Sequence, residues 1–141
     1  TRDWHVDPGS HFAPSGTEPD YVETWPVHCR ADTAGAELHP ALRLPEGSVV
    51  VQKGEYSAAL SGFEGHDGAG RTLDQILRDA AITDVDLAGI ATSVCDRATA
   101  LGAYARGFET RLLLSLCTDV TGADTEETLR ELETVGVGIE R

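Results

Sequence analysis

Hydrophobic and polar positions from residue 48 onward follow the order of a strand, a helix and then another strand. Residues 48–54, SVVVQKG, form a short apolar run that ends at a glycine and predict a buried strand. Residues 71–82 carry apolar side chains at helical spacing, and Thr72 precedes them as a capping residue, which predicts an amphipathic helix. The apolar face of that helix would be formed by Leu73, Ile76, Leu77 and Ala80.

The same order repeats in the second half of the chain. Residues 84–92 predict a second apolar strand, and residues 93–107 predict a helix of small residues that ends at Gly107. The continuous apolar run within residues 110–120 predicts a third strand that is buried on both faces. Residues 124–136 predict a last helix, with Asp124 and Glu127 at the spacing of a capping box, and residues 137–140 predict an edge strand.

Strands that alternate with helices across short connections are typical of an α/β fold with a parallel sheet. We therefore expect residues 1–141 to form a single domain of this class. Sites in such sheets form at the carboxyl ends of the strands, which directs attention to Lys53, Cys95 and Asp119.

The first forty-five residues show neither helical nor strand periodicity and are rich in Pro, Gly, Asp, His and Thr. A loop of this length is either functional or disordered. Trp4, Phe12 and Trp25 are residues of buried type, so we expect an ordered, functional segment.

Cys95 begins a predicted helix, where free amide groups and the helix dipole favour a thiolate and can hold an oxyanion. A small buried hydrophobic residue is the equally plain alternative. Lys53 lies at the end of another predicted strand, and beside a thiol it would stabilise negative charge. His28 or Asp3 is a candidate base for Cys95, which would make a generic thiol hydrolase.

Asp3, His5 and His11 lie within nine residues of polar, loop-like sequence, and His28 follows in WPVHC. One carboxylate and three imidazoles suit Zn²⁺, Fe²⁺ or Mn²⁺. The spacing matches no zinc-finger pattern, and surface or capping histidines are the alternative interpretation. We expect one divalent metal ion here.

Charge and cysteine content restrict the partners. The chain has 24 acidic and 11 basic residues, a formal net charge of −13, which makes nucleic acid and anionic membranes unfavourable partners. Three cysteines without a pairing pattern indicate free thiols in a reducing compartment, and no stretch has the features of a signal peptide or membrane span. We expect a cytoplasmic protein that acts on a small molecule, with a homo-oligomer as an open alternative.

The segments TRDWHVDPGSHF, WPVHC, DTAGAELHP, VQKGEYSAALSGFEG and GIATSVCDRATALGAYARGF occur in this order. Together they resemble the nicotinamidase/pyrazinamidase branch of the isochorismatase-like cysteine hydrolases over essentially the whole chain. The resemblance implies a three-layer α/β/α sandwich with a mostly parallel sheet. It also implies hydrolysis of nicotinamide, and of pyrazinamide-like analogues, to the acid and ammonia through a thioester.

The resemblance further implies a role for individual residues. Cys95 would be the nucleophile and Lys53 its partner, and the amides of Ala91 and Cys95 would form the oxyanion hole after a cis bond between Ile90 and Ala91. The metal would bind the pyridine nitrogen of the substrate and would be held by Asp3, His5, His11 and His28. The substrate pocket would be lined by Trp25, Tyr56 and Ile90.

The chain also departs from the family pattern. Family members begin with a strand that carries the aspartate base, whereas this chain begins at what looks like the end of the second strand. We therefore expect an N-terminally incomplete domain and assign the base to no residue. A catalytically incompetent metal-binding fragment and an amidohydrolase with a different amide substrate are the rival hypotheses. Ser93 stands where members of the family often carry an aspartate, and Leu60 stands where some carry a tyrosine. The first difference would change how the loop around the cysteine is held, and the second would change the shape of the pocket.

Overall fold

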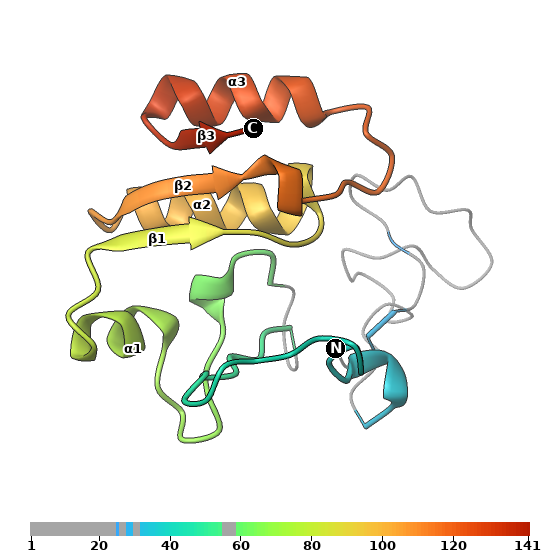
Figure 1. The fold of residues 1–141 in the computed structure, drawn as a ribbon, viewed down its shortest axis with the longest axis vertical. Coiled ribbons are helices and arrows are strands. Elements are labelled where there is room, and N and C mark those ends of the chain that lie inside the picture. Colours follow the sequence, from blue (N-terminus) through green and yellow to red (C-terminus); the bar gives the residue numbers. More distant parts are fainter. Residues whose placement is uncertain (1–24, 26–27, 30–31, 55–58) are drawn as a thin grey trace, which may run out of the picture.

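The structure, a computed structural model, describes Trp25 and residues 28–29, 32–54 and 59–141. Three parallel strands form a sheet in the order β1-β2-β3 (Figure 1). Helices alternate with these strands along the chain, as the sequence predicts. The elements, in chain order, are α1 Leu73–Asp79, β1 Asp84–Leu87, α2 Arg97–Tyr104, β2 Glu109–Leu113, α3 Thr125–Val135 and β3 Gly138–Glu140.

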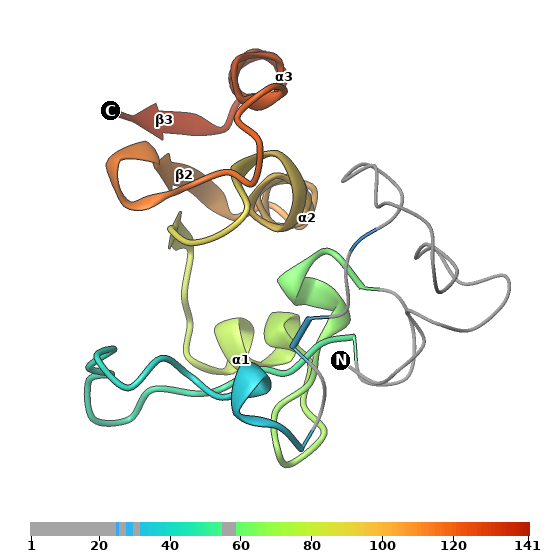
Figure 2. The same cartoon turned by 90° about the vertical axis from the view of Figure 1, so that its right-hand side faces the viewer.

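Helices α2 and α3 lie on the same face of the sheet and enclose the core (Figure 2). Leu112 of the central strand β2 is completely buried between these helices and the sheet. The cluster of buried residues around it contains Ala100, Leu129, Leu132 and Val137. Burial of this apolar face is the main force that orders the carboxyl-terminal half of the chain.

The opposite face of the sheet is charged. Arg111 on β2 pairs with Asp86 on β1 at 2.8 Å and with Glu140 on β3 at 3.4 Å, and all three side chains are exposed. The prediction that residues 110–120 are buried on both faces was therefore wrong. The strand ends at Leu113, and its side chains alternate between exposed and buried because α2 and α3 cover one face only of these strands.

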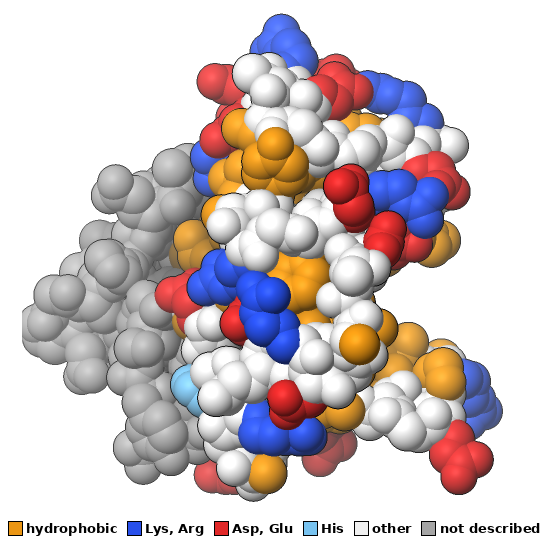
Figure 3. All heavy atoms as spheres, turned by 90° about the vertical axis from the view of Figure 1, so that its left-hand side faces the viewer, with side chains coloured by type: hydrophobic (Ala, Val, Ile, Leu, Met, Phe, Trp, Pro, Cys, Tyr) orange, Lys and Arg blue, Asp and Glu red, His pale blue; other side chains and the backbone are white. Residues whose placement is uncertain are grey.

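The predicted buried strand at 48–54 was also wrong. These residues are irregular, and a single bridge pairs Gln52 with His66 in the antiparallel sense. Val49 and Val50 are each 48% exposed. A ladder requires a neighbouring strand as well as apolar side chains, and the described residues supply only the one bridge partner. Figure 3 shows hydrophobic side chains exposed in the hollow between the upper and lower parts of the molecule.

The predicted cap at the start of α1 is confirmed, whereas the predicted capping box at the start of α3 is wrong. Thr72 caps α1 and forms a capping box with Gln75, as expected, whereas Ala80 lies just past the helix and is exposed. The capping box of Asp124 with Glu127 was wrong, because the side chain of Asp124 makes no capping hydrogen bond. Its backbone (φ −101°, ψ 2°) departs from the extended conformation that places a capping side chain over the first turn.

The described helices are short, and α3, with 11 residues, is the longest. Among the residues that the structure describes, none of the helices has the length and apolar character needed to cross a bilayer.

Candidate functional site

Lys53 and Cys95, which are 42 positions apart in the sequence, come together in the structure. The Nζ atom of Lys53 lies 3.5 Å from the Sγ atom of Cys95, within hydrogen-bond distance for sulfur. Nζ also donates to the carbonyl of Ala59 at 2.9 Å, so the side chain is held from two directions. Both residues are half-buried, and Lys53 is the only lysine of the chain. A thiol beside an ammonium group is an arrangement that supports nucleophilic chemistry.

Residues 89–96, which we call the cysteine loop, connect β1 to α2. The peptide bond between Ile90 and Ala91 is cis, as the resemblance implies. The carbonyl of Ala91 accepts hydrogen bonds from the amides of Val94 and Asp96, which form a wide π-type turn around Cys95. Cys95 therefore lies at the entry to α2, confirming its predicted position at the start of a helix. Ala91 is buried, whereas Ile90 is 65% exposed.

The segment after β2 holds the first half of the cysteine loop, on both sides of the cis peptide bond. The amide of Thr118 donates to the carbonyl of Gly89, and the carbonyl of Thr118 accepts from the amide of Thr92, both at 3.0 Å. Thr92 is almost completely buried. These bonds continue the parallel pairing beyond β1 and set the place of the loop at the carboxyl end of the sheet.

Asp119 also contacts the loop. Its carboxylate accepts from the hydroxyl of Ser93 at 2.8 Å, from the amide of Ser93 at 3.2 Å and from the hydroxyl of Thr125 at 2.7 Å. Burial alone would raise the pKa of Asp119, but the hydrogen bonds from Thr125, Ser93 and Val120 hold that pKa below its usual value.

Asp96, next to the cysteine, lies in a different environment. Its side chain is buried, and its Oδ2 atom has no hydrogen-bond partner. Burial raises the pKa of Asp96, a hydrogen bond with Cys117 opposes this shift, and the charge of Asp119 adds to it. The position of Asp96 in a predicted small-residue helix does not reveal this burial, so sequence reasoning missed it.

The raised pKa of Asp96 predicts a stability effect with a definite sign. The folded state disfavours the ionised carboxylate, so the cost is present at neutral pH and disappears below the unfolded value of 3.8. We expect Asp96→Asn to raise the melting temperature at pH 7 by about 2–4 °C, with the gain shrinking toward pH 3. Thermal unfolding across this pH range checks it, with Glu109→Gln, an exposed carboxylate, as control. A gain that grows as the pH falls would contradict the prediction.

The other candidate residues are only partly covered by the structure. Asp3, His5, His11 and Tyr56 lie outside the described residues, so the metal-ligand and pocket assignments that involve them stay predictions. His28 is exposed, and Trp25 is half-buried. Within the described part of the chain, no three His, Cys, Asp or Glu side chains gather in the manner of metal ligands.

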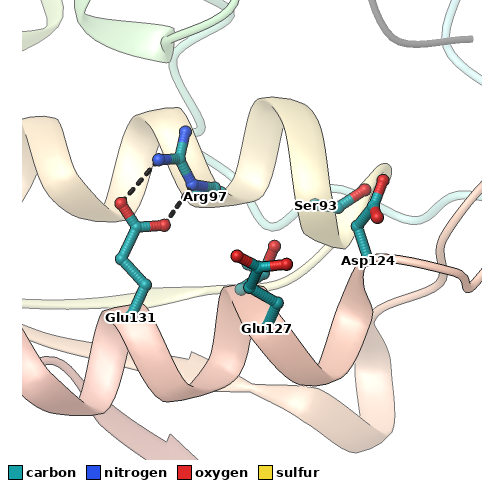
Figure 4. A pocket seen from close by; sticks show the side chains of 6 residues that line it. Ser93, Arg97, Asp124, Glu127 and Glu131 are labelled. Atoms are coloured by element: carbon teal, nitrogen blue, oxygen red, sulfur yellow. Dashed lines mark hydrogen bonds and ion pairs between the residues drawn. The ribbon is translucent and has the colours of Figure 1, made fainter.

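An open hollow lies between α2 and the first turns of α3 (Figure 4). Glu131 forms a two-pronged ion pair with Arg97 at one end, and Ser93 and Asp124 lie at the other end. Neither Cys95 nor Lys53 lines this hollow. Its lining residues are Ser93, Arg97, Asp124, Glu127, Thr128 and Glu131.

Comparison with known proteins places these features in a family. The family described as "Isochorismatase domain" matches residues 9–140. The nicotinamidase/pyrazinamidase of Mycobacterium tuberculosis is 44% identical over 137 residues, which cover 97% of this chain and 72% of that protein.

Solved structures agree with this sequence relationship. A nicotinamidase/pyrazinamidase structure from Acinetobacter baumanii matches with a TM-score of 0.81 at 28% identity, over 99% of this chain and 72% of that one. The pyrazinamidase of Pyrococcus horikoshii in complex with zinc matches with a TM-score of 0.72 at 38% identity, over 83% of this chain and 63% of that one. The parallel sheet, the family match and these relatives agree, so the chain belongs to the isochorismatase family, among its nicotinamidase/pyrazinamidase-like hydrolases.

Proposed function

We propose that this protein is a cysteine amidase that hydrolyses nicotinamide, and pyrazinamide-like analogues, to the acid and ammonia. The observation that carries the proposal is the 3.5 Å approach of Lys53 Nζ to Cys95 Sγ at the carboxyl end of a parallel sheet. The names of the relatives support the class of substrate, because they are nicotinamidases and pyrazinamidases.

The reaction divides into two steps. The sulfur of Cys95 attacks the carboxamide carbon, a carbon–sulfur bond forms, the carbon–nitrogen bond breaks, and the nitrogen leaves as ammonia after gaining a proton. Water then attacks the thioester, the carbon–sulfur bond breaks, and the acid leaves while the sulfur regains a proton. We assign the base that serves these proton transfers to no residue.

Two sets of groups would stabilise the charge in these steps. The ammonium group of Lys53 faces the sulfur and stabilises negative charge on it. The amides of Ala91 and Cys95 would hold the oxyanion, because amide groups aimed at the developing charge are worth several kcal/mol in a water-poor site. The cysteine loop supplies both amides, so its conformation controls this part of the site.

The proposed metal site has a donor set that fits a divalent ion. Three imidazoles and one carboxylate are ligands that Zn²⁺, Fe²⁺ and Mn²⁺ accept, and they would come from Asp3, His5, His11 and His28. The metal would supply an anchor for the pyridine nitrogen. Trp25, Tyr56 and Ile90 would line the ring-binding pocket, and the exposure of Ile90 leaves its side chain available for this contact.

The direct test uses the full-length protein, loaded with metal and incubated with nicotinamide. We expect ammonia and nicotinate to appear in equal amounts. Release from a different amide alone, or no release at all, would contradict the proposal, and the former would favour the rival amidohydrolase. The 141-residue chain is assayed in parallel, because binding of metal without release by that chain alone would favour the incompetent fragment.

The proposed role of the metal predicts that replacing His28 reduces both the metal content and the affinity for nicotinate. We expect His28→Ala to lower the metal content and to weaken the binding of nicotinate by about 10-fold or more, because a ligand to the anchoring ion is lost. Elemental analysis and calorimetric titration of nicotinate measure the two effects without turnover. His39→Ala, which removes an exposed histidine outside the ligand set, is the matched control. Full metal content and unchanged affinity in His28→Ala would contradict the assignment.

A further inference from the structure

The carboxylate of Asp119 joins three parts of the fold through four hydrogen bonds. Its Oδ1 atom accepts from the Ser93 hydroxyl at 2.8 Å and from the Val120 amide at 2.9 Å. Its Oδ2 atom accepts from the Thr125 hydroxyl at 2.7 Å and from the Ser93 amide at 3.2 Å. Asp119 thus connects the cysteine loop, the segment after β2 and the first residue of α3.

Ser93 is the point at which this network reaches the candidate nucleophile. It lies two residues before Cys95, inside the wide turn at Thr92–Asp96, and both its amide and its hydroxyl donate to Asp119. Figure 4 shows Ser93 beside the start of α3. Two bonds to one residue restrain the backbone of the turn as well as its side chain, so a shift of Asp119 would be transmitted to the sulfur.

None of the four hydrogen bonds of Asp119 involves Cys95 or Lys53. The carboxylate therefore acts on the reacting atoms only through the loop. Asp86 also accepts hydrogen bonds with both carboxylate oxygens, in its case from Arg111, but it lies on the open face of the sheet. The two aspartates offer a comparison between a carboxylate that holds the loop and one that holds only the sheet.

We propose that Asp119 is a positioning residue that orients the Cys95 sulfur and the loop amides through Ser93, so that it governs the chemical step and leaves substrate binding nearly unchanged. The proposal rests on the proposed function for its kinetic readout. Charge-assisted hydrogen bonds are stronger than neutral ones, which explains why a single carboxylate can restrain a loop of this length. A displacement of the nucleophile by about 1 Å is enough to reduce a rate about 100-fold.

The test compares Asp119→Asn, Ser93→Ala and the double variant in the full-length protein, with Asp86→Asn as the matched control. Asparagine keeps the size of the side chain but replaces one acceptor oxygen with a donor. We expect Asp119→Asn to lower kcat by about 10- to 100-fold with KM changed less than about threefold, and Asp86→Asn to leave both unchanged. The losses of Asp119→Asn and Ser93→Ala should combine less than multiplicatively in the double variant, since they act through one contact.

A second readout needs no turnover. We expect the rate of alkylation of Cys95 by iodoacetamide, measured by peptide mass relative to exposed Cys29 in the same chain, to change at least about threefold in Asp119→Asn but not in Asp86→Asn. If the wild-type protein releases no ammonia, the proposed function fails, while this ratio still tests the positioning role.

An unchanged kcat and alkylation ratio in Asp119→Asn would overturn the inference, as would fully multiplicative losses in the double variant. Should Asp119→Asn fail to fold, Ser93→Ala decides the matter. In that case, wild-type kcat together with a wild-type alkylation ratio overturns the inference, and a lower kcat at unchanged KM supports it.

Discussion

Replacing Cys95 with alanine will abolish the release of ammonia from nicotinamide, with a loss of about 10⁴-fold or more in kcat. Alanine removes the sulfur that forms the thioester, and the remaining groups of the site cannot supply a nucleophile. The half-buried position of Cys95 at the entry to α2 indicates that the smaller side chain will be tolerated. Ammonia release and metal content, measured on the same sample, check the prediction.

Cys29→Ala is the matched control for this variant, because Cys29 is a second cysteine, is exposed and has no role in the proposed mechanism. We expect it to retain full activity. The metal content of Cys95→Ala should equal that of the wild-type protein, since the thiol is not a proposed ligand. Turnover that survives in Cys95→Ala would refute the thioester mechanism.

Replacing Lys53 with methionine will lower kcat by about 10²- to 10³-fold. Methionine keeps an unbranched apolar side chain but removes the ammonium group that lies 3.5 Å from the sulfur. Stabilisation of developing charge by one preorganised group is worth about this factor. The loss of the hydrogen bond to the carbonyl of Ala59 adds a structural effect, which the melting temperature will report separately from kcat.

Arg78→Met serves as the control for the removal of a positive charge. Arg78 is exposed and pairs with Asp74 on α1. We expect Arg78→Met to keep kcat within about twofold, because exposed ion pairs contribute little and this one does not involve the sulfur. A Lys53→Met variant that also stays within twofold would remove Lys53 from the mechanism.

Local features of the fold were predictable because short segments decide them. Thr72 and Gln75 are three residues apart, so their capping box depends only on the helix that they begin. The end of α3 is also decided locally. Gly136 ends this helix with φ +106°, a left-handed backbone conformation that glycine adopts readily. The alternation of strands and helices predicted the parallel sheet for a related reason, since parallel strands need crossover connections.

The wrong predictions about strands lie where a distant partner decides the outcome, whereas the capping box predicted at the start of α3 failed for a local reason, the backbone conformation of Asp124. Residues 48–54 have an apolar pattern, but only Gln52 meets a bridge partner, so no strand forms. The apolar run after Thr110 predicted burial on both faces, yet Arg111 directs its charge to Asp86 and Glu140 across the strands. Sequence periodicity reports how a segment can be buried, whereas the neighbouring elements determine whether it is.

The sequence by itself determined the class of fold, the candidate nucleophile and the resemblance to a hydrolase family, because each depends on residue types and their order along the chain. The tertiary structure alone decided that Lys53 lies 3.5 Å from Cys95 and that Asp119 holds Ser93. These contacts join residues that are 42 and 26 positions apart. Contacts at such separations form only when packing of the core brings the strand ends together, and local sequence carries no record of that distance.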